Sequence, residues 1–157
     1  MQFLAREEVA APIDTVFAAI SDFEWMERAA LRRGADVARA DSLAAPGPGM
    51  AWIAEFDLHG KRRRLETAIT TYAPPDRIVL QSHLEGLAGV GTVDLVHLAP
   101  SRTRIAVAVH LRPQTLGARV VLQTVRLART GLSDRFNSGL HRFAREIEAG
   151  RFGDAGA

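Results

Sequence analysis

Apolar residues recur at helical spacing in two places, near the beginning of the chain and along its last quarter. Near the beginning they predict two short helices, at about residues 12–20 and 23–32, separated by Ser21 and Asp22. The short side chain of Asp22 can accept the free N–H groups of the second helix, which favours a helix start there. Along the last quarter, the same spacing predicts a long amphipathic helix over residues 116–149.

Between these helices, apolar and polar residues alternate, as they do in strands that have one buried face. Short runs rich in Pro, Gly and Asp separate the alternating segments and indicate turns. Seven strands are predicted, at residues 2–9, 35–41, 50–58, 61–72, 77–85, 91–98 and 103–111. The glycine-rich stretch 86–91 is interpreted as a loop that leads into the sixth strand. The pattern therefore predicts an α+β fold in which a long C-terminal helix covers a twisted antiparallel sheet.

The alternation also divides the sheet into two faces. The predicted inner face is apolar apart from Thr67, Ser82 and His97. Its larger apolar members are Trp52, Phe56, Leu65, Ile69, Leu80, Leu84, Val93, Leu95, Val107 and Val109. Two interpretations stay open: a packed core, or the wall of an apolar cavity with a few polar groups. A shift of the register by one residue would exchange the faces and bring Asp94 and His110 inward together.

The long C-terminal helix has an apolar stripe for the sheet, but its length raises a difficulty. About 34 residues at roughly 1.5 Å each extend on the order of 50 Å, which exceeds the size of a compact domain of this length. A bend is therefore predicted at Thr130–Gly131 or at residues 137–139. The C-terminal half is expected to pack on the core. The N-terminal half, with Val121 and Val125, is expected to cover a cavity and to move.

Composition narrows the function classes. The chain has 157 residues, a formal net charge of +2 and no cysteine, which excludes disulfides and thiolate metal sites and disfavours nucleic-acid binding. The basic run at residues 61–64 lies on a predicted strand, where alternation sends its side chains to both faces. No apolar run is long enough for a membrane span and no signal peptide is recognisable, so a cytoplasmic protein is expected. We expect a single domain over residues 1–150 and a disordered tail at 151–157.

Several short motifs, taken together, resemble one superfamily. They are APIDTVF at residues 11–17, SDFEW at 21–25, GMAW at 49–52, GK at 60–61 and YAPPDR at 72–77. Followed by a long C-terminal helix, they resemble the START-like, helix-grip fold, and more specifically the polyketide cyclase/dehydrase and lipid-transport superfamily, often labelled SRPBCC. The resemblance covers about residues 2–149. It implies a curved antiparallel sheet of about six to seven strands wrapped around the long C-terminal helix, with two short helices after the first strand.

The resemblance also implies a cavity between the sheet and the C-terminal helix that holds a small hydrophobic or lipid-like ligand, for transport or sensing. The superfamily includes lipid carriers, hormone receptors, aromatic cyclases and co-chaperone domains. The paired Cys/His pattern of its Rieske oxygenase relatives is missing from this sequence, so we expect no metal and no other cofactor. The residues expected to bind the ligand are Trp52, Phe56, Leu65, Thr67, Ile69, Leu80, Ser82, Val93, Leu95, His97, Val107, Val109, Val121 and Val125.

Two alternative functions stay open, as does the oligomeric state. A cofactor-independent cyclase or dehydratase would need a general acid or base in the cavity. His97 is the candidate in the predicted register, and the lack of a carboxylate beside it argues against an enzyme. Asp94 and His110 are the candidates in the shifted register. A protein-interaction module of the co-chaperone kind would instead need a contiguous exposed apolar patch.

Overall fold

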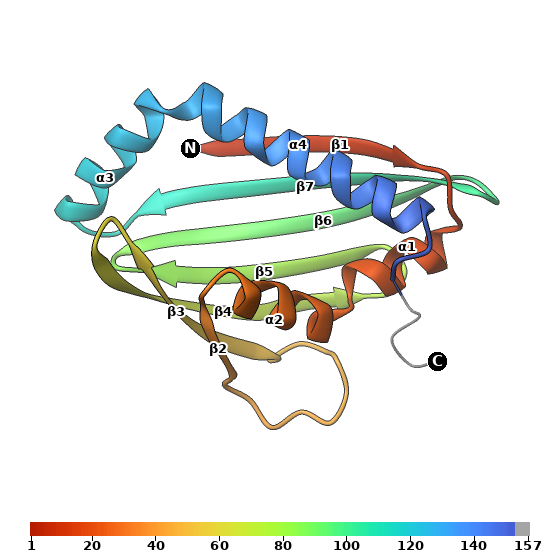
Figure 1. Ribbon diagram of the computed structural model, residues 1–157, viewed down its shortest axis with the longest axis horizontal. Coiled ribbons are helices and arrows are strands. Elements are labelled where there is room, and N and C mark those ends of the chain that lie inside the picture. The colour runs from red at the N-terminus through yellow and green to blue at the C-terminus, as the bar shows by residue number, and fades with distance from the viewer. Residues whose placement is uncertain (153–157) are drawn as a thin grey trace.

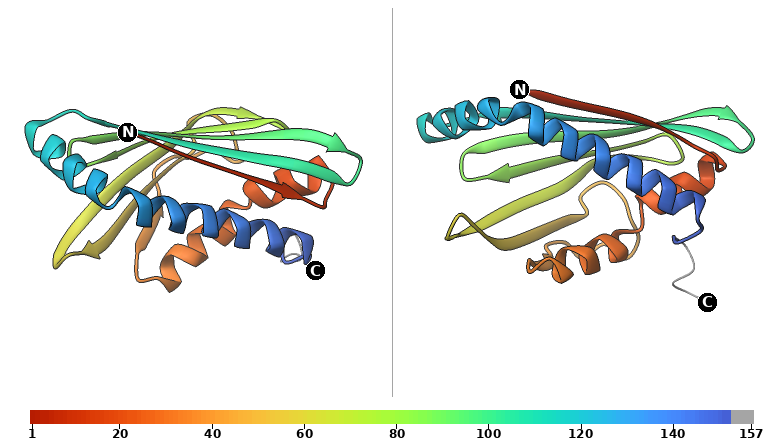
Figure 2. Two further views of the ribbon diagram at one scale, coloured as in Figure 1. Left: turned by 90° about the horizontal axis from the view of Figure 1, so that it is seen from above. Right: turned by 45° about the horizontal axis from the view of Figure 1, so that its top comes forward.

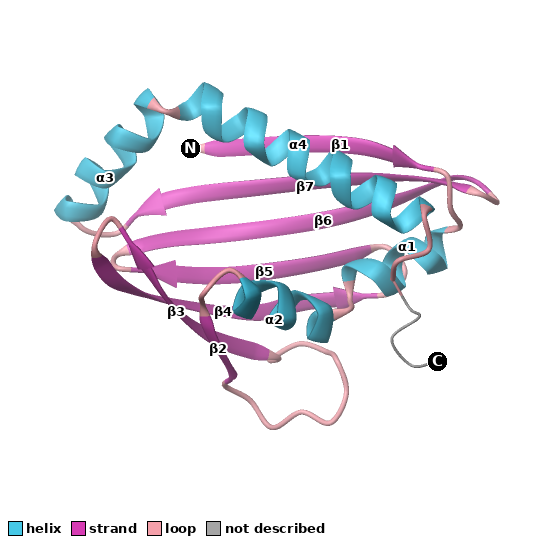
Figure 3. Cartoon of the chain, in the orientation of Figure 1, coloured by secondary structure: helices cyan, strands magenta, loops and turns pink. Residues whose placement is uncertain are grey.

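The computed structural model describes residues 1–152 as a curved sheet with helices gathered on its concave face (Figures 1 and 3). The elements in chain order are β1 (Gln2–Val9), α1 (Ile13–Ile20), α2 (Phe23–Arg32), β2 (Asp36–Arg39), β3 (Ala51–Leu58), β4 (Lys61–Ala73), β5 (Arg77–Leu84), β6 (Leu87–Ala99), β7 (Arg102–Pro113), α3 (Leu116–Leu127) and α4 (Arg129–Glu148). The seven strands form one antiparallel sheet in the order β1-β7-β6-β5-β4-β3-β2. The predicted α+β helix-grip fold is confirmed.

Two helices lie over different parts of the concave face. The helix α4 runs along the sheet and packs against β1, whereas α2 packs against the short edge strand β2 on the opposite side (Figures 1 and 2). The helix α1 packs against β6, β7 and α4 and covers one end of the sheet. The middle strands β5 and β6 therefore form a floor between α2 and α4.

The predicted inner face of the sheet is confirmed by the strand register. Val93 lies directly opposite Ile78 on one side and Val107 on the other. Thr67 lies directly opposite Trp52 and Ser82. Because directly opposed residues point to the same side of a sheet, the predicted inner residues of neighbouring strands share the concave face.

Irregularities in the strand pairing change the predicted positions of single residues. A bulge in β4 turns Tyr72 toward the core, where its ring packs edge-on against Phe17 with 5.6 Å between the ring centroids. A second irregularity lies at the end of β6, between His97 and Ala99, and the His97 side chain is exposed. The prediction that His97 lies in a cavity is therefore wrong, because its place beside the β6–β7 turn leaves it in solvent.

The core lies at the end of the concave face where α1 and the C-terminal half of α4 meet the sheet. Val16 of α1, Ile105 of β7 and Ile147 of α4 are buried there. Thr103 is a fully buried polar residue of this region, and its hydroxyl donates a hydrogen bond to the carbonyl of Ala11 over 2.9 Å. The prediction that the C-terminal half of the last helix packs on the core is confirmed.

The predicted long helix is two helices in the structure. They are separated by Ala128, whose N–H donates to the carbonyl of Val125 as at a helix end, and α3 turns away from α4 at this point (Figure 1). The bend lies close to the predicted site at Thr130–Gly131, whereas residues 137–139, the other predicted site, stay helical. The turn allows α4 alone to follow the sheet.

The end of the described chain packs against the helices. The ring of Phe152 lies 4.8 Å from that of Trp25 in α2 and 4.9 Å from that of Phe143 in α4, between ring centroids. The predicted disordered tail begins at residue 151, but the packed chain extends at least to Phe152. Residues 153–157, the rest of that predicted tail, lie outside the described residues.

Candidate functional site

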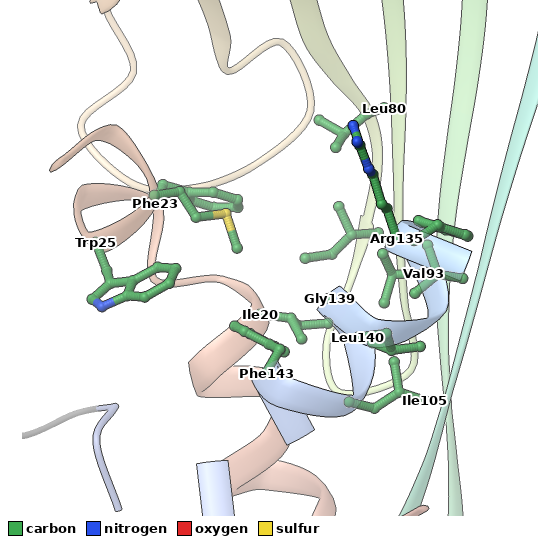
Figure 4. A pocket seen from close by; sticks show the side chains of 14 residues that line it. Ile20, Phe23, Trp25, Leu80, Val93, Ile105, Arg135, Gly139, Leu140 and Phe143 are labelled. Atoms are coloured by element: carbon green, nitrogen blue, oxygen red, sulfur yellow. The ribbon is translucent and has the colours of Figure 1, made fainter. Parts of the chain in front are cut away.

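A cleft of about 440 Å³ lies between α2 and α4 on the concave face of the sheet (Figure 4). Strands β5, β6 and β7 form its floor, the end of α1 and the first turn of α2 form one wall, and the middle of α4 forms the other. The residues that line it are Ile20, Phe23, Trp25, Met26, Ile78, Leu80, Val93, Ile105, Val107, Arg135, Phe136, Gly139, Leu140 and Phe143. Pockets for small molecules have volumes of roughly 300–1,000 Å³, so the cleft is large enough for one.

A glycine of β6 lies on the inner face of the sheet, beside the floor of the cleft. Strand β6 begins at Leu87, so most of the stretch predicted as a loop at residues 86–91 is strand. Gly91 lies opposite Leu80 and Val109 on the inner face, and a Cβ atom at this position would meet no other atom within 4 Å. The missing side chain leaves free space above β6, beside Leu80.

The α2 wall is fixed by a helix cap. The carboxylate of Asp22 accepts a hydrogen bond from the N–H of Trp25 over 3.1 Å, which is the capping role predicted for Asp22. The capped turn carries Phe23, Trp25 and Met26, all of which line the cleft. The cap therefore holds the large side chains of this wall at a set position relative to the sheet.

The α4 wall combines large apolar residues with a gap. Phe136, Leu140 and Phe143 follow one another at spacings of four and three residues and so lie on one face of the helix. Gly139 lies beside them, and a Cβ atom there would meet nothing within 4 Å. The sequence pattern predicts this stripe as core packing, whereas in the structure it also faces the cleft.

Arg135 is the one charged residue among those that line the cleft. Its side chain extends from α4 toward Leu80 in Figure 4, and it is exposed to solvent. None of the ion pairs formed within residues 1–152 includes Arg135. Since a guanidinium stays protonated in proteins, the cleft has a permanent positive charge at this point.

A smaller chamber of about 210 Å³ adjoins the cleft and shares Phe23, Met26 and Leu80 with it. Its other lining residues are Glu27, Ala30, Val37, Trp52, Ala54 and Thr67. The polar side chains of the chamber have partners: the Trp52 indole N–H donates to the Glu27 carboxylate over 2.7 Å, and the hydroxyls of Thr67 and Ser82 lie 2.8 Å apart. The chamber therefore extends the apolar space toward β3 and β4.

The structure places the predicted ligand-binding residues in two groups. Those that line the cleft or the chamber are Trp52, Thr67, Leu80, Val93 and Val107. Those that line neither are Phe56, Leu65, Ile69, Ser82, Leu95, His97, Val109, Val121 and Val125. Ile69 and Leu95 are buried in the core instead.

The contribution of α3 is the main correction to the predicted site. Val121 and Val125 were expected to cover the cavity, but they belong to α3, which the bend at Ala128 carries away from the cleft. The cleft is covered by α4 and α2 instead. The sequence does not show that α2 lines the cleft. Trp25 and Met26 follow a predicted helix cap, but the spacing of residues along α2 does not tell how far this helix lies from α4.

The candidate catalytic residues do not meet in the cleft. His83, His97 and His110 are all exposed, and none of them lines the cleft. Asp94 is paired with Arg77, whose Nε lies 2.6 Å from a carboxylate oxygen, and this hydrogen bond raises the pKa of the guanidinium. Because the register is the unshifted one, Asp94 and His110 lie on the convex face. The arrangement required by the cyclase alternative is thus not formed by these residues.

Two further observations concern ions and membranes. Within residues 1–152, no three His, Asp or Glu side chains gather as a metal ion would require. In the same part of the chain, no helix is both long and apolar enough to cross a membrane.

Comparisons with known proteins agree with the fold. The family model described as "Polyketide cyclase / dehydrase and lipid transport" matches residues 2–148. No curated protein matches the chain. The solved structure of the Zhui aromatase/cyclase from Streptomyces sp. R1128 is similar over 100% of this chain and 99% of its own, with 15% sequence identity and a TM-score of 0.67.

Two other solved structures are similar in the same way. The protein TTHA0849 from Thermus thermophilus has 14% sequence identity and a TM-score of 0.67, over 96% of this chain and 99% of its own. A START superfamily protein from Mycobacterium smegmatis has 16% sequence identity and a TM-score of 0.56, over 88% of this chain and 98% of its own. At these identities the likeness shows a common fold.

Proposed function

Because the chain belongs to the polyketide cyclase/dehydrase and lipid transport family, we propose that it binds a small hydrophobic or lipid-like molecule in the cleft between α2 and α4. The observation that carries this proposal is the lining of the cleft, which is apolar except for Arg135. Removal of apolar ligand surface from water would drive binding, at roughly 25 cal/mol per Å² before the cost of the freedom of motion lost on association is subtracted.

Arg135 supports a preferred orientation of the ligand. An apolar body fits among Phe136, Leu140 and Phe143, while a carboxylate or another anionic end would meet the guanidinium of Arg135 at the solvent side. Charge-assisted hydrogen bonds to a guanidinium are stronger than those between neutral groups. The ligand class favoured by the cleft is therefore an amphiphile with one anionic end.

Replacement of Gly139 tests the site. In the variant Gly139→Leu, the added side chain is expected to occupy the cleft, because a Cβ atom at this position meets nothing within 4 Å. Binding of a fluorescent fatty acid, measured by titration, should weaken about tenfold or more. The substitution should not destabilise the helix, since glycine in a helix interior is about 1 kcal/mol less favourable than alanine.

The matched control for this experiment is Gly131→Leu. Gly131 also lies in α4, with no atom within 4 Å of its Cβ position, but it does not line the cleft. This variant should bind the fatty acid like the unmodified protein. Native mass spectrometry should likewise detect a co-purifying small molecule with Gly131→Leu and lose it with Gly139→Leu. Equal binding by both variants would refute the proposed site.

A further inference from the structure

The helix α3 has two apolar faces. Ala118 and Leu122 are buried against the rest of the protein. On the opposite side, Leu116, Val120 and Leu127 are 78%, 64% and 92% exposed. At 3.6 residues per turn these three side chains lie within about 40° of one another around the helix axis. They form an outward stripe of apolar residues that nothing in residues 1–152 covers.

Arginine residues flank this stripe. Arg119 and Arg126 lie two helical turns apart beside it, and together with Gln123 they line a hollow of about 330 Å³ next to Pro113 and Leu122. Neither arginine takes part in an ion pair formed within residues 1–152. The segment 112–133 contains four arginines and no Asp or Glu, so the surface around the stripe is positively charged.

The shape of the molecule makes this surface accessible. Since the chain turns at Ala128, α3 projects beyond the body formed by α4 and the sheet (Figure 2). Its outward stripe can therefore meet a flat surface without interference from the other helices.

We propose that α3 docks the protein on an anionic lipid surface. Leu116, Val120 and Leu127 would lie among the lipids at the level where headgroups meet acyl chains, and Arg119 and Arg126 would bind lipid phosphates from the flank. A helix with an apolar face and an arginine-rich polar face is suited to lie in the plane of such an interface. The attraction of each arginine to anionic lipid adds to the burial of the stripe.

Charge complementarity favours this occupant over a second copy of the chain. In a symmetric dimer the same surface meets itself, so both copies would bring the arginines of α3 to the interface. Juxtaposed like charges oppose association. The proposal concerns α3 and does not depend on the cleft between α2 and α4 binding a ligand.

Vesicle co-sedimentation of the full chain tests the proposal. The protein should pellet with vesicles of phosphatidylcholine mixed with phosphatidylserine, much less with vesicles of phosphatidylcholine alone, and less at high salt because salt screens the arginines. The double variant Val120→Asp/Leu127→Asp should reduce binding about tenfold or more, because it places carboxylates in the stripe. The double variant Arg119→Gln/Arg126→Gln should weaken binding to the anionic vesicles and remove most of its salt dependence.

The control variant is Leu31→Asp, which changes a leucine on α2 that is 52% exposed. It should bind vesicles like the unmodified protein, and circular dichroism should show that all variants are folded. Either of two results of the vesicle assay would overturn the proposal: no preference of the unmodified protein for the anionic vesicles, or equal loss of binding in Leu31→Asp and in the α3 variants. A dimer in sedimentation equilibrium that Val120→Asp/Leu127→Asp dissociates would also overturn it, since the stripe would then be covered by a second copy.

Discussion

At the scale of single residues, the proposed preference of the cleft for an anionic ligand depends on Arg135. In the variant Arg135→Gln, the affinity for a fatty acid should fall about fivefold, since an ion pair that is open to solvent contributes up to about 1 kcal/mol. The affinity for the methyl ester of the same acid should not change, because the ester has no charge. Isothermal titration calorimetry with both ligands measures the difference. Arg142→Gln, an exposed position of α4 outside the cleft, is the control and should bind both ligands normally.

Most single positions on the sheet follow from the alternation of the sequence, because a period of two fixes which side chains share a face. Val93 and Val107 are examples: they lie directly opposite one another on the concave face, where both line the cleft. His97 is the exception. Its strand ends in an irregular pairing beside a turn, and no change in the alternation marks that point. Alternation therefore predicts which face of the sheet a side chain lies on, but not its exposure where a strand ends in an irregular pairing.

At the scale of elements, the loop between β2 and β3 depends on Asp41. Its carboxylate accepts hydrogen bonds from Arg39 and from the N–H groups of Ala51, at 2.7 Å, and Leu43, at 2.9 Å. Arg39 also lies 5.7 Å from the centre of the Trp52 ring, which borders the smaller chamber. These contacts, the bond from Arg39 first, hold the pKa of Asp41 well below its usual range.

This lowered pKa gives a prediction for acid stability. The unfolded chain, in which Asp41 has a normal pKa near 3.9, takes up a proton before the folded chain does as the pH falls. The contribution of Asp41 to stability is therefore complete above about pH 5 and is lost progressively below about pH 4. Urea unfolding at a series of pH values should show that Asp41→Asn lowers the free energy of unfolding at pH 7 and reduces its further loss in acid. Asp76→Asn, at an exposed turn, should leave both unchanged.

The elements themselves were predictable to different degrees. Asp22 predicts the capped start of α2, because its short side chain can accept hydrogen bonds from the free N–H groups there. The break between α3 and α4 does not fall at a glycine but at Ala128, although alanine is the best helix former. Contacts with the rest of the fold outweigh local preference at this point. For the same reason, the pattern could not tell that α2 and α4 stand far enough apart to leave a cleft.

At the scale of the whole molecule, ligand binding should stabilise one part of the protein more than another. A ligand that binds only the folded state, at a concentration 100 times its dissociation constant, adds about 2.7 kcal/mol to the free energy of unfolding. Hydrogen exchange measured by mass spectrometry should slow mainly in α2, α4 and β5 when a fatty acid is bound. The exchange of α3 should hardly change. Protection concentrated in α3 would instead point to a ligand beneath that helix.

The rings of Trp25, Phe143 and Phe152 have a consequence for how a ligand passes in and out. They join α2, α4 and the last described residues at one end of the cleft. Arg135 lies eight residues before Phe143, which is about 12 Å along the helix axis. The contacts of the three rings tie the two helices together at this end of the cleft, and the turn of α4 that carries Arg135 lies outside this cluster. If the chain binds an amphiphile as proposed, we expect it to pass on the Arg135 side, with its hydrocarbon end entering first and its charged end leaving first.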